Sequence, residues 1–216
     1  MTAALLTLAD SRLPAGGHTH SGGVEQAIAA GVVADPATLA AFLRRRLATS
    51  GAVAAGLAAA ACDAAGNADR LAMLDVEADA RTPSPALRAA SRQQGRGLVR
   101  VGRRAWPAAV WDALPDRPHH PIALGIAAAA GGLTGRDSAA AAAYLSVSGP
   151  ATAAQRLLAM DPLTVAAVTA RLAPEIDAVA DRCRNGHFGT LPAATDPLLD
   201  LLAEVHAARK DRFFAS

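Results

Sequence analysis

The sequence contains few aromatic residues and few β-branched ones. Its 216 residues include four Phe, two Trp and one Tyr, so aromatic side chains make up 3% of the chain. Sheet proteins draw on aromatic and β-branched residues, and their scarcity argues against a sheet. Alanine, the strongest helix former, stands instead at 58 positions. With a hydrophobic content of 52%, this predicts an ordered all-α protein, and the length fits one domain over residues 1–216.

Cysteine, lysine and net charge are scarce as well. Cys62 and Cys183 are too few for a disulfide framework or a thiolate metal site. Lys210 is the one lysine among 21 basic residues, and a formal net charge of +2 gives no field that attracts nucleic acid or an anionic membrane. The N-terminus lacks the basic flank of a signal peptide, and the apolar run over residues 121–135 is too short to span a bilayer. We therefore expect a cytoplasmic protein.

Local start signals divide the chain into helices. Ser21 is expected to cap an early helix that carries Val24 and Ile28. Four later helices are predicted where an acceptor side chain precedes a proline, a pairing typical of helix N-termini. These pairs are Asp35-Pro36, Ser84-Pro85, Asp161-Pro162 and Asp196-Pro197.

Helix breaks are predicted as well. Gly51 is a candidate break after the helix that starts at Pro36, and two separate helices are expected over residues 137–147 and 150–159. One uninterrupted helix is expected from residue 161 to about 184. No segment alternates with a period of two, so no strand is predicted. The fold class that follows is an irregular all-α bundle of about eight to ten helices.

Catalytic signatures are missing from the glycine-rich stretch after residue 12. Gly17 and Gly22 have the spacing of a phosphate-binding loop, but Gly23 occupies the position where that loop needs lysine. The dinucleotide fingerprint, the His-Glu-x-x-His motif and the nucleophile elbow are also missing. We therefore expect a protein without catalytic activity and without a cofactor.

Two histidine pairs raise the hypothesis of a metal site. His18 and His20 lie in the glycine-rich stretch, and His119 and His120 lie in a proline-rich region. Imidazole binds nickel, zinc and copper well, so a chaperone that itself binds nickel stays open as a hypothesis. No carboxylate or thiolate stands at ligand spacing beside either pair. Capping or surface roles are therefore favoured, and no metal ligand is assigned.

A row of arginines recurs at every fourth position between residues 88 and 104. Such a row drifts slowly around a helix and predicts a broad basic face, able to meet nucleic acid or an acidic protein. Aromatic side chains for base stacking are missing from it, which favours a solvated face or an acidic partner. Its members are Arg88, Arg92, Arg96, Arg100 and Arg104.

The end of the chain carries two of the four phenylalanines. Phe213 and Phe214 follow the charged stretch from Arg209 to Arg212. Chain ends are normally polar and poorly ordered, so scarce aromatic residues placed there predict an anchor. The pocket that receives this anchor belongs either to this protein or to a partner.

Several segments together resemble the F-type urease accessory protein family, UreF. Residues 5–25, LLTLADSRLPAGGHTHSGGVE, are similar to the opening signature of that family. The similarity continues through residues 92–95, 119–121 and 161–162. It ends with residues 196–216, which include the Arg212-Phe213-Phe214 close, so it extends over essentially the whole chain.

The resemblance implies an all-helical, dimer-forming protein with no catalytic activity. Members of the family bridge a D/H-type accessory protein and the GTPase UreG, and they support GTP-dependent nickel insertion into apo-urease, whose active-site lysine is carbamylated. The N-terminal segment 1–20 and the C-terminal tail 208–216 would contact partners. Position 18 departs from the pattern, because His18 stands where many relatives have an aromatic residue. The implied partner-binding residues are Pro14, Gly16, Gly17, His20, Ser21, Glu25, Arg212, Phe213 and Phe214.

Overall fold

Helices form every regular element in the part of the chain that the structure describes, so the all-α prediction is confirmed. The structure is a computed structural model that describes residues 3–10, 12–15 and 17–215, with only the backbone of His18. The α-helices are α1 (Ala3–Ala9), α2 (Val24–Ala29), α3 (Pro36–Arg46), α4 (Ala52–Asp63), α5 (Ala68–Ala80), α6 (Pro85–Ala105), α7 (His120–Ala130), α8 (Gly135–Leu157), α9 (Pro162–Arg171), α10 (Ala173–Cys183) and α11 (Pro197–Ala208). A π-helical turn (Leu47–Gly51) and three short 3-10 turns (Gly17–Thr19, Ala109–Ala113, Phe188–Thr190) complete the described elements.

The four helix starts predicted from an acceptor followed by proline are confirmed. Asp35 caps α3 and forms a reciprocal capping box with Thr38. Ser84, Asp161 and Asp196 cap α6, α9 and α11 in the same way, each through a side-chain oxygen that accepts a backbone N–H of the first turn. Such a cap satisfies one of the N–H groups that a helix start leaves without a partner.

The predicted break at Gly51 is replaced by a π-helical turn. The Leu47–Gly51 turn joins α3 and α4 into one continuous helical segment. A Cβ atom at position 51 would lie 2.6 Å from Oγ of Ser146 and 3.1 Å from the carbonyl oxygen of Arg46, so glycine lets the turn lie close against α8.

The predicted division between residues 147 and 150 is wrong, because α8 is one helix that continues through Pro150. Proline has no N–H, so the carbonyl of Ser146 loses its helical donor. Nε of Arg46 donates to that carbonyl oxygen at 3.0 Å and replaces the missing bond.

The single helix expected over residues 161–184 is divided in two. It is interrupted at Leu172, a fully buried residue between α9 and α10. Pro174 stands in the first turn of α10, where its missing N–H costs nothing.

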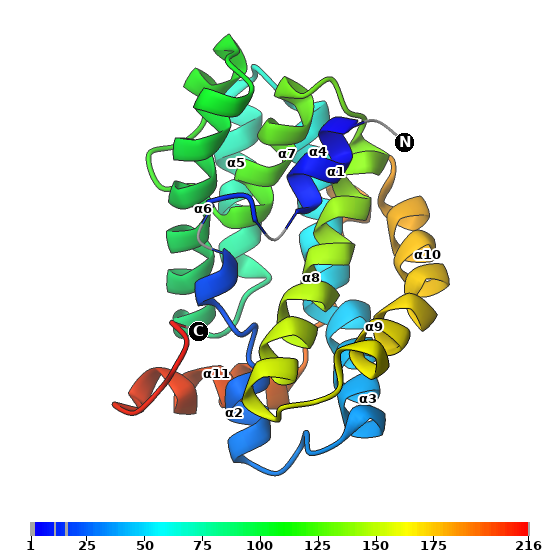
Figure 1. Cartoon of the computed structure of the whole chain (residues 1–216). Helices are drawn as coiled ribbons and strands as arrows, with labels where there is room; N and C mark the ends of the chain where they lie inside the picture. The colour runs from blue at the N-terminus through cyan, green and yellow to red at the C-terminus, as the bar shows by residue number, and fades with distance from the viewer. Residues whose placement is uncertain (1–2, 11, 16, 216) are drawn as a thin grey trace.

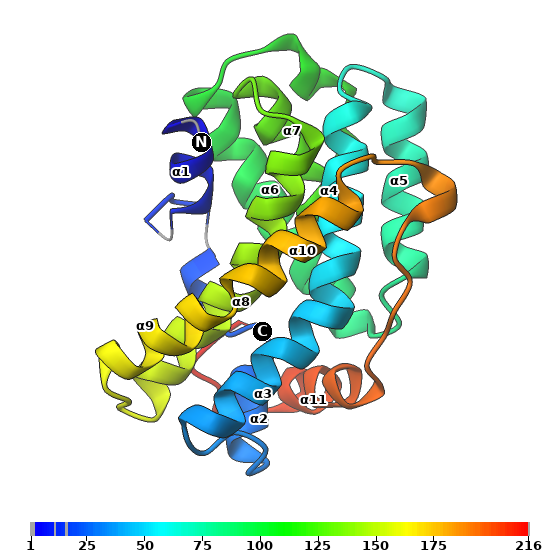
Figure 2. The same ribbon diagram turned by 90° about the vertical axis from the view of Figure 1, so that its right-hand side faces the viewer.

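The core lies around α4, which is buried along almost its whole length. Figure 1 shows α4 between α5 and α6 on one side and α9 and α10 on the other, and Figure 2 shows α10 passing in front of α4. Small residues bring the helix backbones together: a Cβ at Gly125 of α7 would lie 2.4 Å from the carbonyl oxygen of Ala58 in α4. Within the described residues, no helix is both long enough and apolar enough to cross a membrane.

Candidate functional site

The C-terminal tail of the chain folds back onto the first turn of α2, where Glu25 receives it. The N–H of Phe213 donates to Oε1 of Glu25 at 2.7 Å, and the N–H of Phe214 donates to Oε2 at 3.0 Å. Nε2 of His206, in the last turn of α11, lies 2.8 Å from the same Oε2. Glu25 and His206 are only 4% and 2% exposed. One buried carboxylate therefore connects α2, α11 and the tail.

Two further contacts join the same segments. Nη1 of Arg209 donates to Oε1 of Gln26 at 3.1 Å. The N–H of Ala215 donates to the carbonyl oxygen of Thr19 at 2.7 Å. Figure 1 shows the red tail beside the blue segment that leads into α2. The structure thus brings together two segments that the sequence places at opposite ends of the chain.

The donors around Glu25 set its charge state. Burial acts to raise the pKa of this carboxyl group. The N–H of Phe213, the ring of His206 and the N–H of Phe214 act against burial, and the net result is a pKa below the ordinary value. Glu25 is therefore an anion at neutral pH, and the tail is bound by charge-assisted hydrogen bonds.

The two phenylalanine rings of the tail lie in different environments. Phe214 is half-buried, packs against the hydrophobic core and lines a cavity of about 480 Å³. Phe213 is 85% exposed. The predicted anchor therefore separates into two parts, because Phe214 is received by this protein itself while the ring of Phe213 stays in solvent.

The paired glycines after Ser21 shape the entry into α2. Gly22 and Gly23 have φ angles of +61° and +87°, a region that favours glycine. A Cβ at Gly22 would also lie 2.7 Å from Cγ of Pro150 and 3.4 Å from Cζ of Arg46. The N-cap residue is Gly23, in this left-handed turn, rather than the predicted Ser21. Oγ of Ser21 still accepts the N–H of Glu25, in the first turn of α2, at a long 3.5 Å.

The predicted partner-binding residues are divided between the surface and the interior. Gly16 lies outside the described residues, as does the side chain of His18. Three predicted residues are buried, namely His20, Ser21 and Glu25. Four are exposed, namely Pro14, Gly17, Arg212 and Phe213. Of the buried members, Glu25 binds the tail, and the exposed members are available to another molecule.

In the second histidine pair, His119 is buried and His120 is half-buried. Nδ1 of His119 lies 3.0 Å from Oγ of Ser91, and Nε2 lies 2.8 Å from Oδ1 of Asp79. Its backbone N–H donates to Oδ1 of Asp75 at 2.8 Å. A metal ion at His119 would have to displace one of these partners. In the described residues no cluster of three or more His, Cys, Asp or Glu side chains is arranged to hold a metal.

His120 and His20 come together from distant parts of the sequence. Both line the 480 Å³ cavity beside Phe214. Burial, and to a lesser extent the nearby His20, lowers the pKa of His120 to about 4, so its ring is neutral at physiological pH. His20 of the first histidine pair and His120 of the second thus line the same cavity.

The predicted basic face of five arginines is wrong for two of its members. Arg92 donates to Asp75 at 2.9 Å and to Asp79 at 2.6 Å, both on α5. Arg88 donates to the carbonyl oxygens of Thr82 at 2.7 Å and Pro83 at 3.0 Å. Both side chains stabilise the α5–α6 corner, the connection over residues 81–84 and the helix ends beside it. The remaining exposed members are Arg96, Arg100 and Arg104.

Sequence reasoning missed His206 and Arg209 as members of the site. Both lie near the end of α11, and nothing in their local pattern distinguishes them from ordinary helix-terminal residues. Their partners Glu25 and Gln26 stand more than 180 positions earlier, in α2. Only the close of the tail, with its two phenylalanines, indicated that this region has a specific contact.

Comparison with known proteins identifies the family of the chain. The UreF family model matches residues 33–173, which covers α3 to α9 in full. The chain is 52% identical to the urease accessory protein UreF of Mycolicibacterium vanbaalenii, over 99% of this chain and 98% of that protein. It is 51% identical to the UreF of Mycobacterium marinum and 48% identical to that of Mycobacterium tuberculosis strain H37Rv, again over 99% of this chain and 98% of each relative. A family match over more than half of the chain, with relatives this similar along almost all of it, shows that the protein belongs to the UreF family of urease accessory proteins.

Proposed function

We propose that this protein is a non-catalytic urease maturation factor that bridges the D/H-type accessory protein and the GTPase UreG. In this role it supports GTP-dependent insertion of nickel into apo-urease, with nickel as cargo rather than as a resident cofactor. Membership of the UreF family supports the accessory role. We also propose that the protein acts in the cytoplasm and forms a homodimer within the complex.

The surface that we propose for the D/H-type partner is formed by the exposed residues around the tail. The observation that carries this is the contrast between the fixed backbone and the free ring at position 213. Glu25 binds the N–H of Phe213 at 2.7 Å, while the side chain is 85% exposed. A large apolar ring that is presented in a fixed position loses little conformational freedom on binding, which is typical of interface hot spots. Arg212, also exposed, adds a cation beside it.

Single alanine variants test this surface by co-purification with the D/H-type partner. We expect Phe213→Ala to weaken the complex by at least tenfold, because hot-spot truncations commonly cost about 2 kcal/mol or more. Its free energy of unfolding should stay near that of the wild type, since the ring is exposed. Phe214→Ala should instead lower stability, because that ring packs against the core.

The matched control is Leu163→Ala on α9. Leu163 is 80% exposed and apolar, and Figure 1 shows α9 on the side away from the tail. We expect this variant to bind the partner like the wild type. If both tail variants bind the partner as tightly as the wild type does, the tail is not part of the interface.

The structure gives little support to the alternative, a nucleic-acid or regulatory binding protein that uses the basic face from Arg88 to Arg104. Arg88 and Arg92 are bonded within the chain, so the face is narrower and less charged than the sequence predicts. Nucleic-acid binding depends strongly on salt because phosphate contacts release counterions. A salt-sensitive gel shift at physiological ionic strength would favour the alternative, and we expect none.

A further inference from the structure

Arg46 occupies an unusual place between α3, α8 and the N-terminal signature. It stands at the last position of α3, where the π-helical turn begins. Its Nε atom donates to the carbonyl of Ser146, which Pro150 leaves without a helical partner. A Cβ atom at Gly22 would lie 3.4 Å from its guanidinium carbon. The bond from Nε orients the guanidinium and leaves its two terminal nitrogens for another acceptor.

Among the described residues, no carboxylate lies within ion-pair distance of Arg46. Its sequence neighbours differ in this respect, because Arg44 pairs with Glu175 and Arg45 pairs with Asp196. Burial lowers the pKa of Arg46 to about 10, so the group is still a cation at neutral pH. A partly desolvated cation without a counter-charge is costly, and it favours a bound anion.

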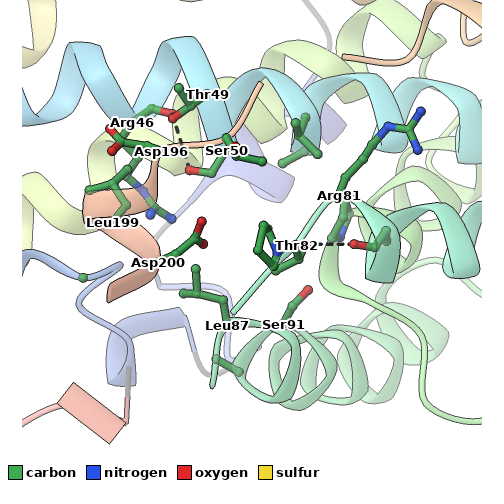
Figure 3. A pocket seen from close by; sticks show the side chains of 18 of the residues that line it. Arg46, Thr49, Ser50, Arg81, Thr82, Leu87, Ser91, Asp196, Leu199 and Asp200 are labelled. Atoms are coloured by element: carbon green, nitrogen blue, oxygen red, sulfur yellow. Dashed lines mark hydrogen bonds between the residues drawn. The ribbon is translucent and has the colours of Figure 1, made fainter. Parts of the chain in front are cut away.

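Arg46 lines two cavities that differ in charge. The smaller, of about 180 Å³, also contains Asp196 and Asp200 in its wall. Figure 3 shows Arg46, Asp196 and Asp200 on one side of this cavity and Arg81 with Thr82 on the other. Carboxylates at this wall would repel an anion.

The larger cavity, of about 480 Å³, has the opposite balance. Its one carboxylate among the described lining residues is Asp10, which is bound by Nε and Nη2 of Arg12. Arg46 and Arg156 therefore remain as positive charges without a carboxylate partner in the described part of the chain. Tyr144 and Gln94 add neutral hydrogen-bond donors to the same wall.

We propose that this larger cavity is a binding site for one small oxyanion of the carboxylate or phosphate type. The two terminal nitrogens of Arg46 match the spacing of two oxygens on such an anion. Arg156 supplies a second positive charge. The volume of about 480 Å³ is ample for an anion of this size. This site is independent of the proposed bridging function.

Anion titrations of the full-length, isotope-labelled protein, followed by NMR, test the site. Sodium phosphate and sodium acetate are added separately, and sodium chloride keeps the ionic strength constant. We expect saturable shifts of the Arg46 side-chain signal and of the Gly22 and Tyr144 amides with at least one anion. The anion that saturates identifies the class as phosphate or carboxylate, and either result supports the site.

Three variants locate the binding. Arg46→Gln should weaken anion affinity at least tenfold, and Arg156→Gln about threefold or more, since each removes one charged donor. The exposed side chain of Arg156 forms no hydrogen bond with the described residues, so Arg156→Gln should fold and remains informative if Arg46→Gln does not fold. The matched control is Arg104→Gln on α6, which is exposed and should bind like the wild type. Linear, unsaturable shifts with both anions, or one affinity shared by all variants, would overturn the proposal.

Discussion

Glu25 shows how one side chain can determine the position of a distant segment. A buried carboxylate is unfavourable unless donors surround it, and here the donors come from the other end of the chain. Because two of them are backbone N–H groups, the identity of the tail residues matters less for this contact than the path of the tail. The side chains of Phe213 and Phe214 are thereby free to have separate roles.

Acid should weaken this contact as the carboxylate of Glu25 becomes protonated. The pKa of Glu25 is lower in the folded protein than in the unfolded chain, so its stabilising contribution is complete above the unfolded pKa of about 4.3. The contribution is lost as pH falls through the folded pKa. We expect Glu25→Gln to be less stable near pH 7 by about 1.5–3 kcal/mol, the usual value of a charge-assisted hydrogen bond. Its stability should also depend less on pH in the acid range.

Urea unfolding at several pH values measures this difference. Glu175→Gln is the control, because Glu175 is an exposed partner of Arg44 and should affect stability by less than about 1 kcal/mol. If the curves of Glu25→Gln and the wild type run parallel from neutral to acid pH, Glu25 is not the titrating group.

At the scale of helices, close packing depends on glycine at particular positions. Gly125→Ala on α7 would place a Cβ 2.4 Å from the carbonyl oxygen of Ala58. We expect a loss of about 1–3 kcal/mol, the usual cost of overpacking a core. Gly149→Ala on α8 is the matched change at a helical glycine where a Cβ would meet no atom within 4 Å. It should stabilise the protein by about 0.5–1 kcal/mol, because alanine is the better helix former.

Thermal or urea unfolding distinguishes the two variants by the sign of the change. If both substitutions stabilise the protein, or both destabilise it equally, then α4 and α7 do not approach as closely as described.

Helix starts could be predicted from the sequence because their causes are local. Asp35, Ser84, Asp161 and Asp196 each bond to N–H groups within three residues, so the short pattern contains the whole interaction. The fate of Pro150 could not be predicted in this way. Its helix continues because Arg46, about a hundred residues earlier, supplies the missing donor.

The candidate site was predictable only in part for the same reason. The resemblance indicated Glu25 and Phe213 as members of one interface, but not that they bond to each other across 188 positions. Ser21 followed a local rule for capping and was displaced by the left-handed turn at Gly22 and Gly23. Arg88 and Arg92 follow the helical period of a surface row, and carboxylates or carbonyls of the α5–α6 corner turn them inward.

At the scale of the whole molecule, the tail is a small part of the fold that we propose contributes to partner binding. Removal of residues 211–216 deletes both N–H donors to Glu25 and the packing of Phe214. We expect helical content to stay near that of the wild type, because no α-helix is shortened. The melting temperature should fall by about 2–4 °C for each kcal/mol lost. Binding to the D/H-type partner should be abolished.

Circular dichroism and co-purification measure the two effects separately. Phe213→Ala is the informative comparison, since it should lose binding at an unchanged melting temperature. If the truncated chain still binds the partner, the interface lies elsewhere on the protein.

The alanine-rich centre of the bundle has a consequence for how this protein tolerates mutation. Alanine has no side-chain rotamers to lose, so burying it costs little conformational entropy. It also leaves little volume to remove, so substitutions along α4 can rarely create large cavities. Random variation in this core should therefore act mainly through side chains that are too large. Evolution along α4 is then limited by the space between backbones rather than by hydrophobicity.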